Sequence, residues 1–395
     1  MTDRLDGPTT ARIPRRAVTA LVTAVGVVAC VTWLVRNAPP EQPAPRPVPA
    51  PDPAHATTDG STLAVRFADA RHAFALTGAC RRGPAVTCSY ELRSSSDGGR
   101  TWQTRPAPLI PVAAEAGFSA DLTTLGPRSV LIVDRGRRWF STDAGRSWRA
   151  VRLSSGRTVP EVPPGATLVG SCPPGFAATA GCDRPVAALD PRTGQRSGLA
   201  SQPRLLAASA TDRATTARDG SLWISGIQAG KPAIAVTRDR GRSWRTVPLA
   251  APTTPLIGVS VLTHDGRTVY AFVRARAPAG VTVKNSLAAI WRATDGGASW
   301  HRVRPRFPGA QPDSALGLAL LPGGRLLVTT EEFDRANLRY SDDGGRQFVR
   351  SPGPAPSLGW IEEVDGRYTA SGTHGDFFTS TDGIRWTPIP SYRRG

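Results

Sequence analysis

The stretch Ser95-Ser96-Asp97-Gly98-Gly99-Arg100-Thr101-Trp102 recurs along the chain, with variations, in five further copies. We call these six segments the repeat turns. Their aspartates and aromatic residues are Asp97 with Trp102, Asp143 with Trp148, Asp239 with Trp244, Asp295 with Trp300, Asp343 with Phe348, and Asp382 with Trp386. An aspartate at a turn accepts hydrogen bonds from backbone N–H groups a few residues on, and glycine supplies the positive φ of a tight reversal. Each copy therefore predicts a β-hairpin whose aromatic residue starts the outgoing strand, and six copies predict a repeat protein.

The repeat turns closely resemble the Asp-box, or bacterial-neuraminidase repeat, whose pattern is S-x-D-x-G-x-T-W. Two copies depart from it, because Phe348 replaces Trp and the last copy is one residue short before Trp386. The resemblance covers nearly everything after the N-terminal segment. It implies a β-propeller in which each box joins the third and fourth strands of a blade, away from the usual ligand site. It does not specify function, since sialidases, xyloglucanases, sortilin-type receptors and photosystem II assembly factors share it. This chain most resembles the non-catalytic propellers of the assembly-factor and receptor type.

The spacing of the repeat turns predicts the number of blades. The gap between Asp143 and Asp239 is about double the others, and Leu189–Gly194 lies midway as a decayed copy. We therefore predict an all-β fold, a propeller of seven four-stranded blades over residues 61–391, with six or eight blades as alternatives. Short runs rich in β-branched or aromatic residues predict its strands. They are 63–67, 72–76, 86–93, 101–105, 118–125, 130–133, 139–141, 148–153, 205–208, 222–225, 259–262, 269–273, 316–320, 326–330, 359–364 and 368–371.

The N-terminal segment predicts a membrane anchor. Residues 17–35 contain no charge and are about long enough to cross a bilayer as a helix. The arginines within residues 1–16 place that end in the cytoplasm, so the rest of the chain is expected outside. Residues 36–60 are rich in proline and predict an extended spacer.

Two other export signals fit the same segment. Val27-Val28-Ala29-Cys30 can be interpreted as a lipobox, in which Cys30 is lipidated after cleavage. Arg15-Arg16 offers a twin-arginine signal without its surrounding consensus. The apolar run continues beyond Cys30, which favours the uncleaved helix, and all three interpretations end at the outer face of a membrane.

The remaining four cysteines predict two disulfides. Cys80 and Cys88 bracket one short loop and Cys172 and Cys182 another, as expected for a domain in an oxidising compartment. Zinc is the alternative, but no C-x-x-C spacing or histidine pair accompanies these cysteines. The sequence therefore predicts neither a metal nor another cofactor.

The charge of the chain predicts an anionic partner. Its formal charge is +18 and only two lysines are present, so the excess is arginine. We expect a ligand site on the face opposite the repeat turns, where propellers usually bind. Its candidate residues are Arg81, Arg82, Arg135, Arg137, Arg138, Arg274, Arg276, Glu331, Glu332 and His374. The alternative is a coding bias towards arginine. An acidic protein surface or an anionic envelope polymer fits an exported domain, whereas nucleic acid is not expected there.

Catalysis has less support in the sequence. Sialidases that resemble these repeats use three arginines, a tyrosine with a glutamate, an aspartate and an R-I-P motif before the first blade. Here the motif, Arg12-Ile13-Pro14, precedes the membrane segment, and the tyrosines lie beside turns or strand ends. Another glycosidase would need two facing carboxylates, for which Glu331, Glu332 and others offer only neighbouring acids. We therefore expect a binding or assembly platform, with a glycoside hydrolase of sialidase type as the alternative.

Overall fold

Seven β-sheets make up the part of the chain that the structure, a computed structural model, describes. All of them belong to the unit Thr57–Gly395. The described residues are 61–81, 86–109, 111–113, 118–152, 157–170, 186–205, 214–250, 256–276, 285–308, 315–330, 338–351, 356–372 and 375–390. The predicted cytoplasmic segment, membrane helix, Cys30 and proline-rich spacer all lie outside them. Within these ranges no helix is long and apolar enough to cross a membrane.

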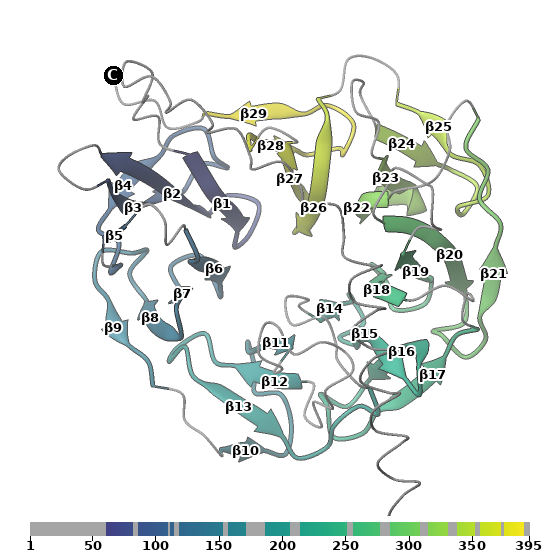
Figure 1. The fold of residues 1–395 in the computed structure, drawn as a ribbon. Helices are drawn as coiled ribbons and strands as arrows, with labels where there is room; N and C mark the ends of the chain where they lie inside the picture. The colour runs from purple at the N-terminus through teal and green to yellow at the C-terminus, as the bar shows by residue number, and fades with distance from the viewer. Residues whose placement is uncertain are drawn as a thin grey trace, which may run out of the picture. The chain divides into compact units, whose positions relative to one another are not determined.

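Figure 1 shows the sheets arranged as a ring, which confirms a seven-bladed propeller. We number them blades 1 to 7 in chain order. Their strands are, for blade 1, β1 (Ser61–Phe67), β2 (Ala73–Arg81), β3 (Thr87–Ser95), β4 (Gln103–Arg105) and β5 (Val112–Ala113); for blade 2, β6 (Asp121–Thr124), β7 (Val130–Asp134), β8 (Arg137–Ser141) and β9 (Arg149–Ala150); for blade 3, β10 (Thr158–Val159), β11 (Thr167–Gly170), β12 (Val186–Leu189) and β13 (Arg196–Leu199); for blade 4, β14 (Thr215–Thr216), β15 (Leu222–Gln228), β16 (Lys231–Thr237) and β17 (Arg245–Pro248); for blade 5, β18 (Leu256–Leu262), β19 (Val269–Arg276), β20 (Asn285–Ala293) and β21 (His301–Val303); for blade 6, β22 (Ala315–Leu320), β23 (Leu326–Thr330), β24 (Leu338–Ser341) and β25 (Val349–Arg350); and for blade 7, β26 (Leu358–Val364), β27 (Arg367–Gly372), β28 (Phe377–Ser380) and β29 (Thr387–Ile389).

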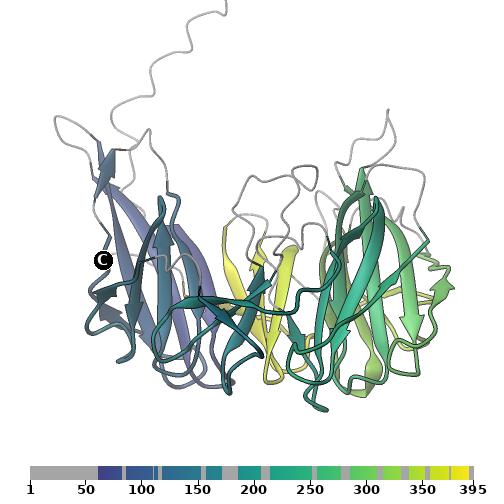
Figure 2. The same ribbon diagram turned by 90° about the horizontal axis from the view of Figure 1, so that it is seen from below.

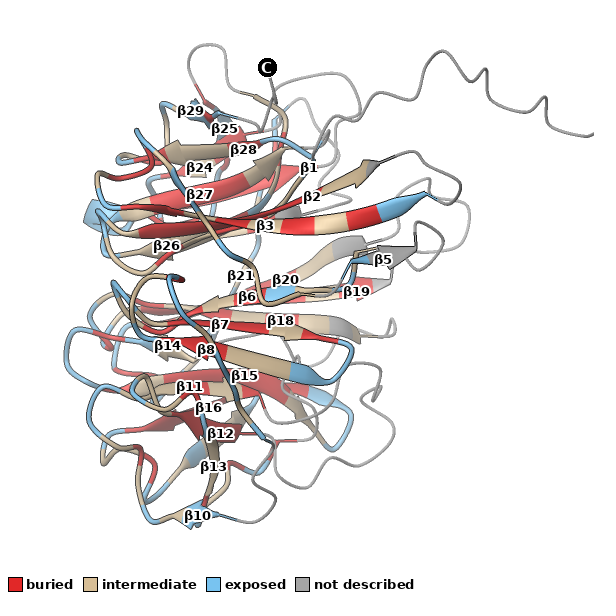
Figure 3. Ribbon diagram, turned by 90° about the vertical axis from the view of Figure 1, so that its left-hand side faces the viewer, coloured by how far each residue is buried: buried red, intermediate tan, exposed pale blue. Residues whose placement is uncertain are grey.

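Each blade packs its two faces against its two neighbours. The middle strands are therefore almost continuously apolar and buried, as in β12 and β23, where every residue is buried. The outermost strands face solvent, and both residues of β9 and of β25 are exposed. Figure 3 shows this gradient from buried strand centres to exposed turns, and Figure 2 shows the strands running across the thickness of the ring.

Blades 7 and 1 close the ring through side chains. Val65 and Phe67 of blade 1 form one buried cluster with Phe377 and Ile389 of blade 7. Each of these two blades is built from its own continuous stretch of chain, so among the described residues no strand is exchanged between the first and last sheets. Apolar burial at this interface therefore has the role of holding the ring shut.

Blade 3 departs from the expected pattern. Its decayed turn at Asp190 joins β12 to β13, which are the second and third strands of the sheet. The outer position is filled by β10, which precedes the other three strands and pairs with β13 in parallel. The strand predicted at 205–208 is wrong for its one described residue, because Leu205 is buried but lies in no strand. Blade 4 instead begins at β14.

Hydrogen bonds to the aspartate hold each repeat turn. In blade 2, Asp143 Oδ1 accepts from the N–H groups of Arg146 (3.0 Å) and Ser147 (2.9 Å), and Oδ2 accepts from the Ser147 hydroxyl (2.6 Å). The Ser141 hydroxyl donates to Asp143 (2.7 Å) and accepts from the N–H of Gly145 (2.9 Å), whose φ is +82°. These contacts confirm the predicted hairpin turns. Partial burial would raise the pKa of Asp143, but the hydrogen bonds prevail and lower it.

The aromatic residues of the repeat turns are packing residues, as their repeated position indicates. All six lie against or within the buried clusters of the blades, namely Trp102, Trp148, Trp244, Trp300, Phe348 and Trp386. The prediction that they start the outgoing strand is wrong by one residue, since Trp102 precedes β4. Its indole N–H donates to Gly99 O (3.0 Å), which folds the ring back under the turn. Only Phe348 is fully buried, and Trp148 is half-buried.

One of the two predicted disulfides is present. Cys80 and Cys88 are directly opposite each other on β2 and β3, with Cα atoms 3.8 Å apart, and their sulfurs are bonded. The short strand β5 pairs with β3 beside this bond, where Cys88 is opposite Val112. Cys172 and Cys182 lie outside the described residues. The described residues contain no cluster of histidine, cysteine and acidic side chains that could hold a metal.

Candidate functional site

The predicted ligand face is described in part. Arg135 lies in the β7–β8 turn, at the opposite end of β8 from the Asp143 repeat turn, and Arg137 is exposed at the start of β8. Arg274 lies on β19, with its guanidinium close to Gly258 of the same blade. Arg81 and Arg276 end strands, but their side chains are outside the described part. Arg82, Glu331, Glu332 and His374 fall outside it altogether, so the convergence of this set stays a prediction.

Two arginines lie between blades 2 and 3. Arg138 of β8 is half-buried and its Nε has no hydrogen-bond partner, while Arg196 of β13 donates to Gly170 O. Burial lowers the pKa of Arg138. Burial, and then repulsion from Arg138, lower the pKa of Arg196 to about 10. The sequence identified Arg138 but missed Arg196, because nothing local shows that neighbouring blades bring the two together.

The four described tyrosines belong to the framework, and one of them, Tyr340, packs against a buried cluster with Arg325 over its ring. Tyr90 is buried and its hydroxyl accepts from Ser119 N–H (3.1 Å). Tyr368 is fully buried, donates to Leu320 O (3.2 Å), and has a pKa raised by burial. Burial also raises the pKa of Tyr270, which lies in an apolar cluster. The raised pKa values make Tyr270 and Tyr368 poor nucleophiles, and the Tyr90 hydroxyl is bound to Ser119, so none of these three fits the role of the sialidase tyrosine.

The described glutamates are occupied locally as well. Glu91 pairs with Arg93 (2.9 Å), and Glu362 lies 3.6 Å from Arg66 across the blade 7–blade 1 interface. Glu363 accepts from the N–H of Gly366 in its own hairpin turn. Glu161 pairs with Arg240 (3.3 Å) and Arg242 (2.6 Å), so these carboxylates serve turns and blade contacts.

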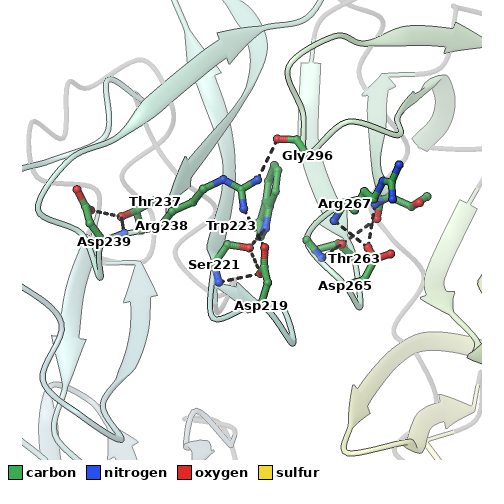
Figure 4. Close-up of polar contacts among 12 residues, drawn as sticks. Asp219, Ser221, Trp223, Thr237, Arg238, Asp239, Thr263, Asp265, Arg267 and Gly296 are labelled. Carbon is green, nitrogen blue, oxygen red and sulfur yellow. Dashed lines mark hydrogen bonds and ion pairs between the residues drawn. The ribbon is translucent and has the colours of Figure 1, made fainter.

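Several arginines are committed to joining blades near the repeat turns. Arg238 of blade 4 donates to Asp219 (2.8 Å) and to Gly296 O (3.3 Å) in the repeat turn of blade 5, as Figure 4 shows. Its guanidinium lies 6.0 Å from the ring centroid of the buried Trp223, whose indole N–H donates to Ser221 (2.8 Å). The sequence placed residues 222–225 on a strand but did not identify Trp223 as the centre of this network.

Two further arginines join blades in the same way. Arg367 of blade 7 donates to Ala70 O (3.3 Å) of blade 1 and lies over the ring of Phe67, 5.7 Å from its centroid. Arg149 of blade 2 donates to Arg192 O (2.8 Å) in the decayed turn of blade 3. Part of the arginine excess is therefore structural.

A different group of arginines lines an open cleft of about 620 Å³ between blades 5 and 6. Its walls come from the end of β20, from β21 and the segment after it, and from the repeat turn of blade 6. The lining residues are Arg292, Thr294, His301, Arg302, Val303, Arg304, Arg306, Asp343, Gly344, Arg346 and Gln347. We call this feature the blade 5–6 cleft.

The blade 5–6 cleft is built on a fixed backbone. Arg306 N–H donates to Arg346 O (2.8 Å), and Phe348 N–H donates to Arg306 O (2.8 Å), so the two walls are hydrogen-bonded to each other. Beneath them Phe307 stacks on Phe348, with ring centroids 4.8 Å apart and planes 6° apart. The spacing of the two walls is therefore set by the buried interface.

The electrostatics of the cleft are one-sided. Asp343 is the only carboxylate among the described lining residues, and desolvation would raise the pKa of this group. Hydrogen bonds from Gln347 N–H (3.0 Å), the Ser341 hydroxyl (2.7 Å) and Arg346 N–H (2.9 Å) outweigh burial and lower that pKa. The carboxylate is thus ionised and committed to its own turn. The arrangement can hold an anion, and besides Asp343 and the arginines, His301 is the other ionisable side chain among the described lining residues.

Sequence reasoning missed this cleft because it lies on the side of the repeat turns, which the family resemblance sets apart from the ligand site. A local signal was present. Arg302-Val303-Arg304-Pro305-Arg306 alternates basic residues along the end of the outermost strand β21 and the segment after it, and Arg346 occupies the variable position of the repeat turn. Alternation places such side chains on one face of a strand.

Comparisons with known proteins give likenesses of low identity. No protein-family model and no curated protein matches the chain. Among solved structures, YCF48 bound to D1 peptide has 15% identity and a TM-score of 0.32, with 84% of this chain and 81% of that chain covered. An α-L-arabinanase of Penicillium chrysogenum complexed with arabinobiose has 15% identity and a TM-score of 0.35, covering 76% and 85%. The propeller domain of the Trilobed protease from Pyrococcus furiosus has 8% identity and a TM-score of 0.40, covering 85% and 100%. At these identities and TM-scores, none of the three likenesses identifies a ligand or a reaction for this chain.

Proposed function

We propose that this chain is an Asp-box propeller, anchored in the membrane by residues 17–35, that binds an anionic envelope polymer or an acidic protein surface as an assembly platform. One observation carries the proposal. The blade 5–6 cleft is lined by five arginines, and the one carboxylate among its described lining residues is held in a turn by hydrogen bonds. Such a site recognises negative charge by guanidinium hydrogen bonds.

The glycoside hydrolase alternative is less well supported by the described residues. Tyr90, Tyr270 and Tyr368 are buried in the framework, and the described glutamates pair locally. A sialidase places a tyrosine and a glutamate together beside three arginines, which these positions do not provide.

The test uses the full-length protein solubilised in detergent and the detergent-insoluble envelope of its own organism. We expect sedimentation with the envelope at low salt and release at high salt, because an arginine site depends on charge. The same preparation should release no sugar from a panel of sialosides and arabinosides. Absence of sedimentation at either salt, or steady hydrolysis of any glycoside, would contradict the proposal.

A further inference from the structure

The arginines of the blade 5–6 cleft differ from those that join blades. Arg304, Arg306 and Arg346 are exposed, and within the described part of the chain no carboxylate forms an ion pair with them. Arg302 is oriented by its bond to Ala288 O (3.3 Å). The partly buried Arg292 lies 5.7 Å from the ring centroid of Tyr270 and its Nε has no hydrogen-bond partner. The cleft therefore presents donors from both walls and from its base.

The balance of charge indicates what these donors would hold. Five arginines against one carboxylate leave four formal positive charges around about 620 Å³. In a chain of linked phosphates each inner group carries one negative charge and two non-bridging oxygens, and each terminal group carries about −1.5 to −2 and three, so a tripolyphosphate or about four phosphodiesters match this charge. Four carboxylates would also match it with as many acceptor oxygens, but they are carried on four separate carbon-linked groups and need more space than the three directly linked groups of a tripolyphosphate.

The geometry of the walls supports a ligand with closely spaced anions. Hydrogen bonds between the backbones of Arg306 and Arg346 fix the separation of the walls, and the Phe307–Phe348 stack holds them from below. Guanidinium groups on a fixed frame bind phosphate oxygens in forked pairs at lower entropic cost than mobile surface arginines do.

From these observations we infer that the blade 5–6 cleft is a binding site for linked phosphate groups, whether of a phosphodiester polymer or of a free polyphosphate. The inference rests on the proposed function for its setting and adds to it the location of the site and the class of ligand.

Calorimetric titration of the full-length protein in detergent with sodium tripolyphosphate tests the inference. The cleft variant carries R304E and R346E. The control variant carries R100E and R146E, which occupy the same repeat-turn position as Arg346 in blades 1 and 2, are equally exposed, and change the net charge by the same amount. We expect at least a tenfold loss of affinity in the cleft variant and less than a threefold change in the control, because each charge-assisted contact is lost only where it is made.

Three results would overturn the inference. The unmodified protein would not bind tripolyphosphate, or both variants would lose affinity equally, as general surface charge predicts. Alternatively, butane-1,2,3,4-tetracarboxylate would bind as tightly as tripolyphosphate, which would remove the preference for phosphate.

Envelope sedimentation of the same proteins separates this inference from the proposed function. Loss of tripolyphosphate binding together with loss of envelope retention in the cleft variant supports both. Tripolyphosphate binding without any envelope retention of the unmodified protein supports the site and refutes the platform. Envelope whose phosphodiesters have been hydrolysed distinguishes the sources: retention should disappear if the polymer supplies the phosphates, and persist if the cleft binds a free polyphosphate.

Discussion

Replacement of Phe348 by alanine should be one of the most destabilising single changes in the ring. Phe348 is fully buried between blades 5 and 6 and stacks on Phe307 at 4.8 Å. Removal of at least about 150 Å² of buried aromatic surface, at about 25 cal/mol per Å², gives about 4 kcal/mol. This value falls within the range of about 3–5 kcal/mol that a buried phenylalanine-to-alanine change usually costs.

Trp148→Ala is the matched comparison, because Trp148 occupies the same position in the repeat turn of blade 2. Its ring is only half-buried, and its indole N–H donates to Pro106 O (2.7 Å) at an exposed site. The exposed part of the ring loses nothing on truncation, so we expect a smaller loss than in Phe348→Ala, about 2–3 kcal/mol. The pattern of the repeats favours the opposite order, since tryptophan is the standard residue and phenylalanine the exception.

Urea unfolding of both variants, followed by tryptophan fluorescence and by circular dichroism, measures the two free energies of unfolding. Coincidence of the two signals justifies treating the transition as two-state, and the slope shows whether the unfolded states are comparable. A loss below about 1 kcal/mol in Phe348→Ala, or a larger loss in Trp148→Ala, would refute the reasoning that burial between blades, and not the repeat pattern, sets the cost.

Three further changes probe the turns, the inner strands and the disulfide. Hydrogen bonds from Ser243 and Thr237 lower the pKa of Asp239 to about 2. The stabilisation that this carboxylate gives to the folded state is therefore complete above the pKa of the unfolded chain and is lost as pH falls towards 2. D239N should flatten the acid-unfolding curve in that window. G317A should cost about 1–3 kcal/mol or more in thermal unfolding, since the new Cβ would lie 2.3 Å from a backbone oxygen of blade 7. G126A, whose new Cβ would meet only the Ser129 Cβ at 3.9 Å, should be near neutral. Reduction of the blade 1 disulfide should cost about 2–3 kcal/mol and leave the far-ultraviolet spectrum unchanged, and loss of that spectrum would show that the bond is needed for the ring itself.

The fold was predictable because its determinants are local. Each repeat turn contains the donors, the acceptor and the glycine of its own hairpin, as Asp143 and Gly145 show, so the sequence indicates a turn wherever the pattern occurs. The departures come from distant partners. The parallel pairing of Thr158–Val159 with Gly198–Leu199 joins segments about a blade apart, and no local pattern of two residues specifies it.

The candidate site was harder to predict for the same reason. Arg304 and Arg346 lie on neighbouring blades. They line one cleft because Phe307 and Phe348 stack on each other where the two blades join. The sequence reports the number of arginines but not which of them find partners. Prediction from the family resemblance also directed attention to the opposite face, most of whose connections lie outside the described residues.

The arginines thus separate into two classes by their surroundings. Arg238 and Arg367 lie over aromatic rings and donate to backbone oxygens of the next blade, where a guanidinium satisfies carbonyls that the turn leaves open. The guanidinium groups of these two arginines are largely engaged in contacts that join neighbouring blades. Arg304 and Arg346 also lie at or beside a repeat turn, but among the described residues no backbone oxygen accepts from their side chains. They line the open cleft instead. A coding bias towards arginine can account for the abundance of both classes but does not place exposed arginines on both walls of one cleft. That placement is why we assign the ligand to the blade 5–6 cleft and not to the basic surface as a whole.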